Sequence, residues 1–396
     1  MVAHVVGGAY SGAPMADEAN GVSGGAAAPE GSAGSPGSPG SPGIGGRKAD
    51  HIELCATGDV GFRAKTTLLD EVELVHEALP EMSLDAVDTS TLVLGKRLRA
   101  PILIAAMTGG TERAQGINRE LAEIAEERGY GFGLGSQRAM LNGSPTSVTY
   151  EVREVAPSTL VLGNIGGVQA RSLSTEAVAE LVAQVGADAL CVHLNPAMEL
   201  VQPEGDRDFG GVLEALERLS AELSVPVVAK ETGCGIGPRT AARLARAGVR
   251  HVDVSGSGGT SWVAVETARA AGTGRALGEA LRDWGIPTAA SVAIVRATRP
   301  RFRTIIATGG VSTGLDVARA LVLGAHAGGI ARPVLQALMS GGREAAIRFL
   351  DQVEAELRAV MLLVGARDLS TLRKVPAVLG PGLRRWLKLA KQYGRG

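Results

Sequence analysis

One lysine lies inside an otherwise apolar run of the sequence. Lys230 follows Val-Val-Ala at 227–229 and precedes Glu231. An ammonium group buried in such a run is costly unless an anion faces it. A neighbouring carboxylate could provide this anion within the protein. The place of Lys230 at the end of the run favours contact with an anionic cofactor atom.

Two neighbouring segments carry the residues of a phosphate site. Gly309 and Gly310 follow one apolar run, and Ala331 and Arg332 follow the next. Backbone N–H groups that glycine leaves accessible can approach phosphate oxygens, and the N-terminus of a following helix adds a positive dipole. Paired glycines also occur in simple turns, but this pair together with the arginine favours phosphate binding.

A polar patch follows the run that contains His193 and Asn195. These two residues are two positions apart, so their side chains point to the same side of a strand. Glu199 comes shortly afterwards and could bind Mg²⁺, which often takes one or two carboxylates together with substrate phosphates. Glu199 could also be a solvated loop residue, and His193 a core histidine.

A basic cluster formed by Arg47, Lys48 and His51 begins the region with folding potential. Such clusters are usually solvated. We expect a functional role only if this segment folds over the site that the other residues form.

These residues need a scaffold, and the sequence supplies eight apolar runs that alternate with helical patterns. Each run is continuous rather than alternating, as expected for parallel strands that are buried on both faces. Eight such units in about 230 residues predict an α/β fold, a (β/α)8 or TIM barrel, over the alternative of a doubly wound sheet. The runs are 101–110, 130–136, 159–167, 189–195, 226–233, 251–259, 304–310 and 327–332.

Polar residues and glycines gather at the C-terminal end of nearly every run. Active sites of (β/α)8 barrels form at that end of the strands. The clustering therefore predicts an enzyme rather than a barrel that serves only as a scaffold.

Residues 1–46 are rich in Gly, Ser and Pro and include the repeat GSPGSPGSPG. They contain almost no large apolar side chain, so they cannot offset the entropy lost on ordering, and we expect a disordered tail. The folded domain is then 47–396, a barrel with N- and C-terminal additions.

Composition excludes several classes of partner. Lys and Arg number 40 and Asp and Glu 41, which argues against nucleic acid as the main ligand. Aromatic residues are only 3%, too few for platforms that stack bases. Three cysteines without a CxxC spacing suit a reducing compartment, so we expect a cytoplasmic protein. No signal peptide or membrane span is predicted.

The sequence resembles the type 2, FMN-dependent, isopentenyl diphosphate isomerases over about residues 47–390. HLNPAMELVQPEGDRDF and DVSGSGGTSW are the most specific of the matching motifs. The matching stretches are RKADHI (47–52), 84–110, GSQRAM (135–140), GNIG (163–166), 193–209, VVAKETGCGI (227–236), 253–262 and 308–325.

The resemblance implies a barrel that binds FMN and moves the double bond of a five-carbon diphosphate. It implies reduced flavin, usually reduced by NADPH, as the acid and base, Mg²⁺ on Glu199, and a homo-oligomer, often a tetramer or octamer. Contacts with FMN carry over to Met107, Thr108, Ser136, Asn164, Lys230, Ser255, Thr260, Gly309, Gly310, Ala331 and Arg332. Contacts with substrate carry over to Arg47, Lys48, Gln137, Arg138, His193 and Asn195, and catalytic positions to Met198, His193 and Trp262.

The sequence departs from this family at Met198, where the resemblance implies a glutamine. Methionine is of similar length but cannot donate a useful hydrogen bond. Ser312 also stands where many relatives have arginine. We expect an isomerase, and the alternative is a related FMN-dependent cyclase of a longer prenyl diphosphate. An α-hydroxyacid oxidase-like flavoprotein is disfavoured, because the region from the sixth to the seventh strand lacks a suitable pair of histidine and arginine for its chemistry.

Overall fold

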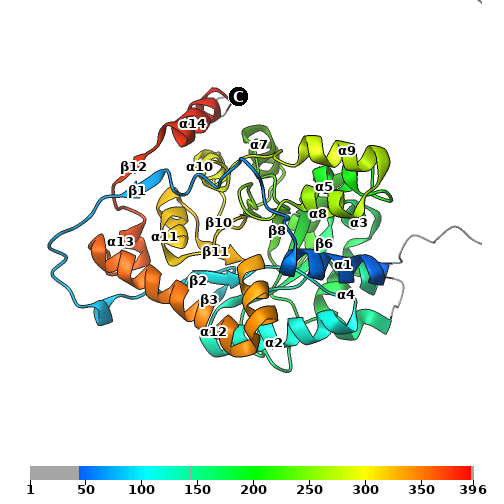
Figure 1. The fold of residues 1–396 in the computed structure, drawn as a ribbon, viewed down its shortest axis with the longest axis horizontal. Coiled ribbons are helices and arrows are strands. Elements are labelled where there is room, and N and C mark those ends of the chain that lie inside the picture. Colours follow the sequence, from blue (N-terminus) through cyan, green and yellow to red (C-terminus); the bar gives the residue numbers. More distant parts are fainter. Residues whose placement is uncertain (1–43, 142–144, 394–396) are drawn as a thin grey trace, which may run out of the picture. The chain divides into compact units, whose positions relative to one another are not determined.

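The computed structural model describes residues 44–141 and 145–393. The predicted tail, up to residue 43, lies outside the described residues. Eight strands form one closed barrel, in which every neighbouring pair is parallel (Figure 1). The (β/α)8 prediction is confirmed and the doubly wound sheet is excluded. The strands are β4 (Ile102–Ile104), β5 (Gly131–Gly133), β6 (Val161–Gly166), β7 (Ala189–Leu194), β8 (Val227–Glu231), β9 (His251–Asp253), β10 (Thr304–Ala307) and β11 (Ala327–Ile330).

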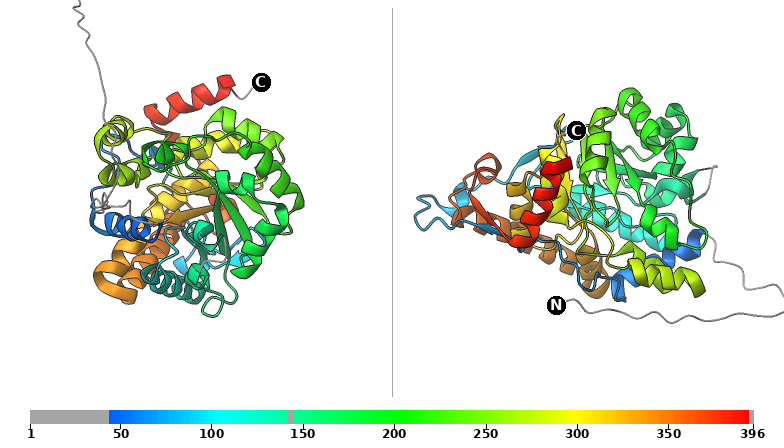
Figure 2. Two further views of the ribbon diagram at one scale, coloured as in Figure 1. Left: turned by 90° about the vertical axis from the view of Figure 1, so that its right-hand side faces the viewer. Right: turned by 90° about the horizontal axis from the view of Figure 1, so that it is seen from above.

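Helices surround the barrel, and local signals set their ends (Figure 2). The Thr111 side chain caps α2, which ends at Gly129 in the left-handed conformation. A capping box of Thr313 and Asp316 opens α11, and Gly324 ends it. The helices between strands include α2 (Glu112–Arg128), α3 (Gly167–Ser172), α4 (Thr175–Gln184), α6 (Val212–Glu222), α7 (Pro238–Arg246), α10 (Thr288–Ala297), α11 (Gly314–Leu323) and α12 (Arg332–Leu363).

The barrel interior is filled with side chains from many strands. Leu103, Leu162, Val228 and Ile306 belong to one buried apolar cluster. The hairpin of β2 (Thr91–Val93) and β3 (Lys96–Leu98) adds Val93 and Leu98 to the same cluster. This hairpin therefore closes the N-terminal end of the barrel and leaves the opposite end for a site.

Short additional elements lie outside the barrel strands, and one pair of them joins an early segment of the chain to a late one. Helix α1 (Ile44–Thr57) begins slightly before the expected start of the folded region. Strand β1 (Val72–Leu74) pairs with β12 (Ala377–Leu379) in an antiparallel ladder. The others are α5 (Pro196–Val201), α8 (Trp262–Arg269), α9 (Gly272–Leu281), α13 (Leu369–Leu372), α14 (Pro381–Tyr393), and the 3-10 helices η1 (Leu84–Ala86), η2 (Gln137–Met140) and η3 (Pro145–Tyr150). No helix of the described ranges is long and apolar enough to cross a bilayer.

Candidate active site

Two adjoining cavities open at the C-terminal end of the barrel strands. The glycine-rich cavity, about 320 Å³, is lined by the loops after β9 and β10 and by the start of α12. The basic cavity, about 140 Å³, is lined by α1, α5 and the ends of β6 and β7. Both are lined by Met107, Thr108, Lys230, Trp262 and His51, so they meet along this shared wall.

The glycine-rich cavity combines a tight backbone turn with a helix N-terminus. Gly309 and Gly310 have φ of 93° and 77°, the left-handed region that glycine adopts most readily. Helix α12 begins at the cavity with Arg332 and Pro333, and no side chain caps its first turn. Its free N–H groups and its dipole favour an anion there.

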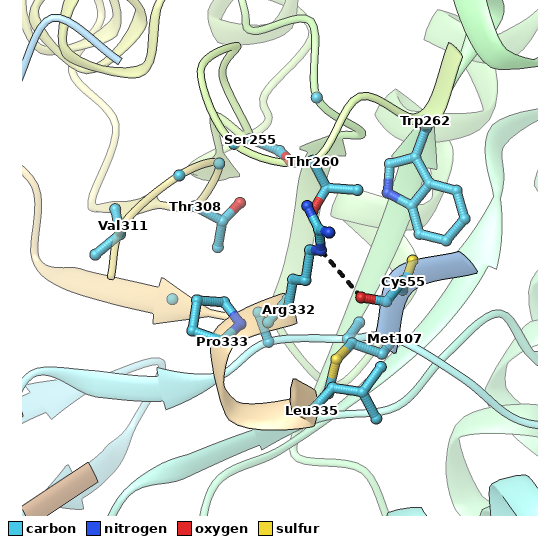
Figure 3. A pocket seen from close by; sticks show the side chains of 18 of the residues that line it. Cys55, Met107, Ser255, Thr260, Trp262, Thr308, Val311, Arg332, Pro333 and Leu335 are labelled. Carbon is cyan, nitrogen blue, oxygen red and sulfur yellow. Dashed lines mark hydrogen bonds between the residues drawn. The ribbon is translucent and has the colours of Figure 1, made fainter. Parts of the chain in front are cut away.

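Arg332 joins this cavity to helix α1. Its guanidinium donates to the carbonyl oxygen of Cys55 at 3.0 Å (Figure 3). It also donates to the carbonyl oxygen of Gly58 at 2.5 Å. The arginine therefore lines the predicted phosphate site and also fixes the end of α1.

Lys230 has an anionic partner within the protein and also lines both cavities. Its Nζ donates to the carbonyl of Glu231 at 2.8 Å and lies 3.7 Å from Asp253 Oδ2. Asp253 also accepts a hydrogen bond from the Thr308 hydroxyl at 2.6 Å. Burial raises the pKa of Asp253, and the positive charge of Lys230 opposes that shift. The ammonium thus has an internal partner and still lines both cavities.

His193 is a neutral group in the basic cavity. Its Nδ1 lies 2.9 Å from Asn164 Oδ1. Burial, helped by the charges of Lys230 and Arg138, lowers the pKa of His193 to about 3. A neutral ring that donates from Nδ1 to Asn164 retains Nε2 as an acceptor. This arrangement suits a binding role at neutral pH better than the release of a proton.

Glu199 is held at the wall of the basic cavity by two donors. Its Oε1 accepts from Asn195 Nδ2 at 2.8 Å, and its Oε2 accepts from the Asp206 N–H at 2.9 Å. The residue is only 7% exposed. Met198 lies beside it in the same wall, and its Sδ is 3.8 Å from Asn195 Nδ2.

Helix α1 brings cations to the basic cavity. Arg47 and Lys48 both line it. Lys48 Nζ donates to the Tyr150 hydroxyl at 2.6 Å and to the Ser136 carbonyl at 3.1 Å. The Tyr150 hydroxyl in turn donates to Ser136 at 2.7 Å. Burial, and secondarily the charge of Arg47, lowers the pKa of Lys48 to about 7.

A charged network docks α1 onto α8. His51 Nε2 lies 2.7 Å from Glu266 Oε1, and Arg269 binds the other Glu266 oxygen at 2.7 Å. Arg269 also pairs with Asp50 at 3.0 Å. The His51 ring meets the edge of Trp262 with a centroid distance of 5.3 Å. Helix α1 therefore folds over the site. A functional role for the basic cluster of Arg47, Lys48 and His51 was expected only in that case.

The structure places all but one of the site residues expected from the sequence at these cavities. The glycine-rich cavity is lined by Met107, Thr108, Lys230, Ser255, Thr260, Trp262, Gly309, Gly310, Ala331 and Arg332. The basic cavity is lined by Arg47, Lys48, Ser136, Arg138, Asn164, His193, Asn195, Met198 and Glu199.

Comparison with known proteins agrees with this geometry. The family described as FMN-dependent dehydrogenase matches residues 44–195 and 198–377. The isopentenyl-diphosphate delta-isomerase of Methanothermobacter thermautotrophicus is 43% identical over 89% of this chain and 99% of that protein. That of Synechococcus sp. is 46% identical over 85% of this chain and 96% of the relative. The chain belongs to the isopentenyl-diphosphate delta-isomerase family.

Solved structures of more distant proteins resemble this chain in fold alone. A mandelate oxidase with an FMN adduct is 19% identical, with a TM-score of 0.59 over 83% of this chain and 95% of that one. In this isomerase-family chain, the loops after β9 and β10 contribute no histidine or arginine to either cavity. The oxidase-like alternative is therefore not supported by the site.

The residues present fit FMN, the cofactor of the family. The uncapped start of α12 and the Gly309–Gly310 turn suit a phosphate. A Cβ on Gly309 would lie 2.1 Å from the Gly256 carbonyl oxygen, so this approach of two loops requires glycine. Lys230 adds a positive charge at the junction of the two cavities.

The residues also fit Mg²⁺ when the substrate supplies ligands. No group of three His, Cys, Asp or Glu that could hold a metal occurs in the described ranges. Glu199 alone offers a carboxylate to the basic cavity, which suits an ion that keeps several waters and binds substrate phosphates.

Gln137 is the one expected substrate contact that the structure places away from both cavities. It is fully buried and lines neither cavity. Its Nε2 donates to the Leu181 carbonyl at 3.0 Å, and its Oε1 accepts from the Asn164 N–H at 2.8 Å. Successive residues of the 3-10 helix η2 point in different directions. Gln137 therefore supports the strand that carries Asn164, while its neighbours face the cavity.

Lys48 is expected to make anion binding depend on pH. Its ammonium is charged below about pH 7 and neutral above it. Affinity for inorganic pyrophosphate should therefore fall as pH rises through about 7, by up to about tenfold per pH unit. Calorimetric titration of wild type and Lys48→Arg measures this, because the arginine remains charged. Equal pH profiles for the two proteins would contradict this role of Lys48.

Glu266 is expected to control the position of α1. In Glu266→Gln the buried partner of His51 and Arg269 loses its charge, so the melting temperature and pyrophosphate affinity should both fall. Breaking a buried ion pair costs about 3–5 kcal/mol. Glu53→Gln on α1 is the matched control, since its pair with Arg113 is exposed and worth about 0–1 kcal/mol. Similar effects of the two substitutions would refute the docking role.

Proposed function

We propose that this protein converts isopentenyl diphosphate to dimethylallyl diphosphate, with reduced FMN and Mg²⁺. The observation that carries the proposal is the junction of the two cavities. A cavity suited to flavin phosphate and a cavity suited to a diphosphate share Met107, Lys230 and Trp262. The relatives that are named isopentenyl-diphosphate delta-isomerases support the same activity.

In this proposal the cations of the basic cavity bind the diphosphate. Arg47, Lys48 and Arg138 supply charge-assisted hydrogen bonds, and Glu199 holds Mg²⁺ against the phosphate oxygens. This binding fixes the five-carbon chain relative to the junction and contributes binding energy that orients the reacting carbons.

The junction residues determine the environment of the reacting carbons. Bound reduced FMN would supply the group that gives a proton to one carbon and removes one from another. Lys230 would stabilise negative charge at that place. Met107 and Trp262 present apolar surface, which excludes water that would otherwise capture a tertiary cation as an alcohol. Neutral His193 serves as a hydrogen-bonding group beside the substrate.

Several properties complete the proposal. We assign NADPH as the reductant, a small prenyl diphosphate as the substrate, and neither nucleic acid nor membrane as a partner. We also propose a cytoplasmic homo-oligomer, a tetramer or octamer. The three cysteines are free, which suits a reducing compartment.

The cofactor requirements test the proposal. Protein loaded with FMN, reduced with NADPH and supplied with Mg²⁺ should convert isopentenyl diphosphate to dimethylallyl diphosphate. Oxidised protein, and reduced protein with EDTA, should form almost none. Chromatography of the two isomers measures the conversion, and equal activity without reduction would contradict the assigned chemistry.

A further inference from the structure

The basic cavity contains polar groups that the protein itself leaves unpaired. Within the described ranges, five buried side-chain nitrogen or oxygen atoms have no hydrogen-bond partner. Two of them, Gln202 Nε2 and Thr232 Oγ1, belong to residues that line this cavity. A buried donor without a partner costs about 1–3 kcal/mol. Two such groups at one cavity indicate that a ligand completes their hydrogen bonds.

Gln202 is the more completely buried of the two residues. It is 3% exposed, although its amide has two donor hydrogens to satisfy. It ends helix α5, where its backbone N–H donates to the Met198 carbonyl at 3.0 Å. The two residues are four apart and lie on the same face of the helix. The Met198 thioether cannot donate, and the nearby Asn195 amide already donates to Glu199. The Gln202 amide is therefore the one left without a partner on this part of the cavity wall.

The loop after Gln202 is fixed rather than free to turn the amide outward. Arg207 Nη2 donates to the Gln202 carbonyl at 3.0 Å, and Arg207 Nη1 donates to the carbonyls of Gly205 and Glu199. The Gly205 N–H also donates to the Gln202 carbonyl at 3.0 Å. These bonds hold the backbone of Gln202 beside Glu199, while its side-chain amide nitrogen is buried without a partner.

We propose that the Gln202 side-chain amide donates a hydrogen bond to a diphosphate oxygen of the substrate. The inference rests on the proposed function for the identity of that substrate. An N–H donor requires an acceptor, and this cavity carries Arg47, Lys48 and Arg138, which favour an anion rich in acceptor oxygens. Gln202 is then a substrate-binding residue, and the Met198 thioether cannot supply its hydrogen bond.

Replacement of Gln202 by methionine tests the contact. Calorimetric titration of the FMN-loaded protein with magnesium pyrophosphate should show binding weakened roughly tenfold to a hundredfold, as expected for one hydrogen bond to a charged group. The ligand-free variant should melt at a higher temperature, because an unpaired buried amide is gone. Unchanged pyrophosphate affinity in a folded variant would overturn the proposal.

A second variant tests the sign of the charge that faces Gln202. Gln202→Glu keeps the length of the side chain but adds a carboxylate, so it should bind pyrophosphate more weakly than Gln202→Met. Equal affinities of the two variants would overturn the proposal. This comparison remains informative if either variant loses some stability, because it uses the folded fraction of each protein.

Ser220→Ala is the matched control. Ser220 Oγ on α6 is also buried and unpaired, but Ser220 lines neither cavity. Its removal should leave pyrophosphate affinity unchanged, and a loss as large as that of Gln202→Met would overturn the inference. Pyrophosphate binding in the predicted order, without turnover of isopentenyl diphosphate, would support the contact and refute the proposed function.

Discussion

Replacing Lys230 with methionine is expected to weaken FMN binding by about a hundredfold or more. Lys230 lines both cavities at their junction, where a bound flavin would carry negative charge. A charged hydrogen bond with a buried partner contributes about 1.5–3 kcal/mol, and the loss of a preorganised cation adds to this. Flavin fluorescence during titration of the apoprotein measures the affinity.

The same substitution also leaves Asp253 without its cation, so stability must be separated from binding. Asp253 is almost fully buried, and an unpaired buried carboxylate is strongly destabilising. The double variant Lys230→Met/Asp253→Asn should recover the melting temperature but not the FMN affinity. Lys96→Met is a control, because Lys96 pairs with Asp188 and lines neither cavity. Restored FMN affinity in the double variant would contradict the role of Lys230.

Met198→Gln is expected to raise the rate of isomerisation about tenfold to a hundredfold. One hydrogen bond near a developing charge is worth about 1.5–3 kcal/mol, and the added amide would lie in the wall of the basic cavity. Steady-state rates of dimethylallyl diphosphate formation by the reduced, FMN-loaded proteins measure the change. Met198→Leu, similar in size and also without a donor, should remain close to wild type.

The cyclase alternative predicts the opposite result for the same variants. A cyclase would leave isopentenyl diphosphate unchanged, act on a diphosphate of ten or more carbons, and lose that activity in Met198→Gln. Parallel assays of both substrates with wild type and variant distinguish the two functions. Turnover of the longer substrate alone would refute the isomerase.

The barrel and several site residues could be predicted from local signals in the sequence, and the family resemblance supplied the other site residues. Continuous apolar runs mark strands that are buried on both faces, and the polar residues after each run lie at one end of the barrel. Lys230 and Glu199 were found from their place relative to such runs. Gly309 and Arg332 were found in the same way, because consecutive parallel strands bring the segments after them together.

The rest depends on contacts between distant segments, which no local pattern shows. His51 and Glu266 are far apart in the chain, so the sequence could not predict that α1 packs on α8. It indicated only that the basic cluster would be functional if its segment folded over the site. Tyr150, whose hydroxyl accepts a hydrogen bond from Lys48, lies in a 3-10 helix that no apolar run or motif of the sequence marks. Gln137 was expected to bind substrate from the family resemblance alone, but the turn of η2 points its amide into the barrel wall. Gln202 lies in a recognised motif, yet only the structure reveals its unpaired amide.

Incubation of the reduced, FMN-loaded protein with isopentenyl diphosphate and Mg²⁺ in D₂O tests the proposed activity most directly. Isomerisation exchanges substrate hydrogens with the solvent, so NMR should show dimethylallyl diphosphate and deuterium in the five-carbon pool. Oxidised protein should show neither. Absence of both product and deuterium from wild type and Met198→Gln, in protein that binds FMN, would contradict the proposed function.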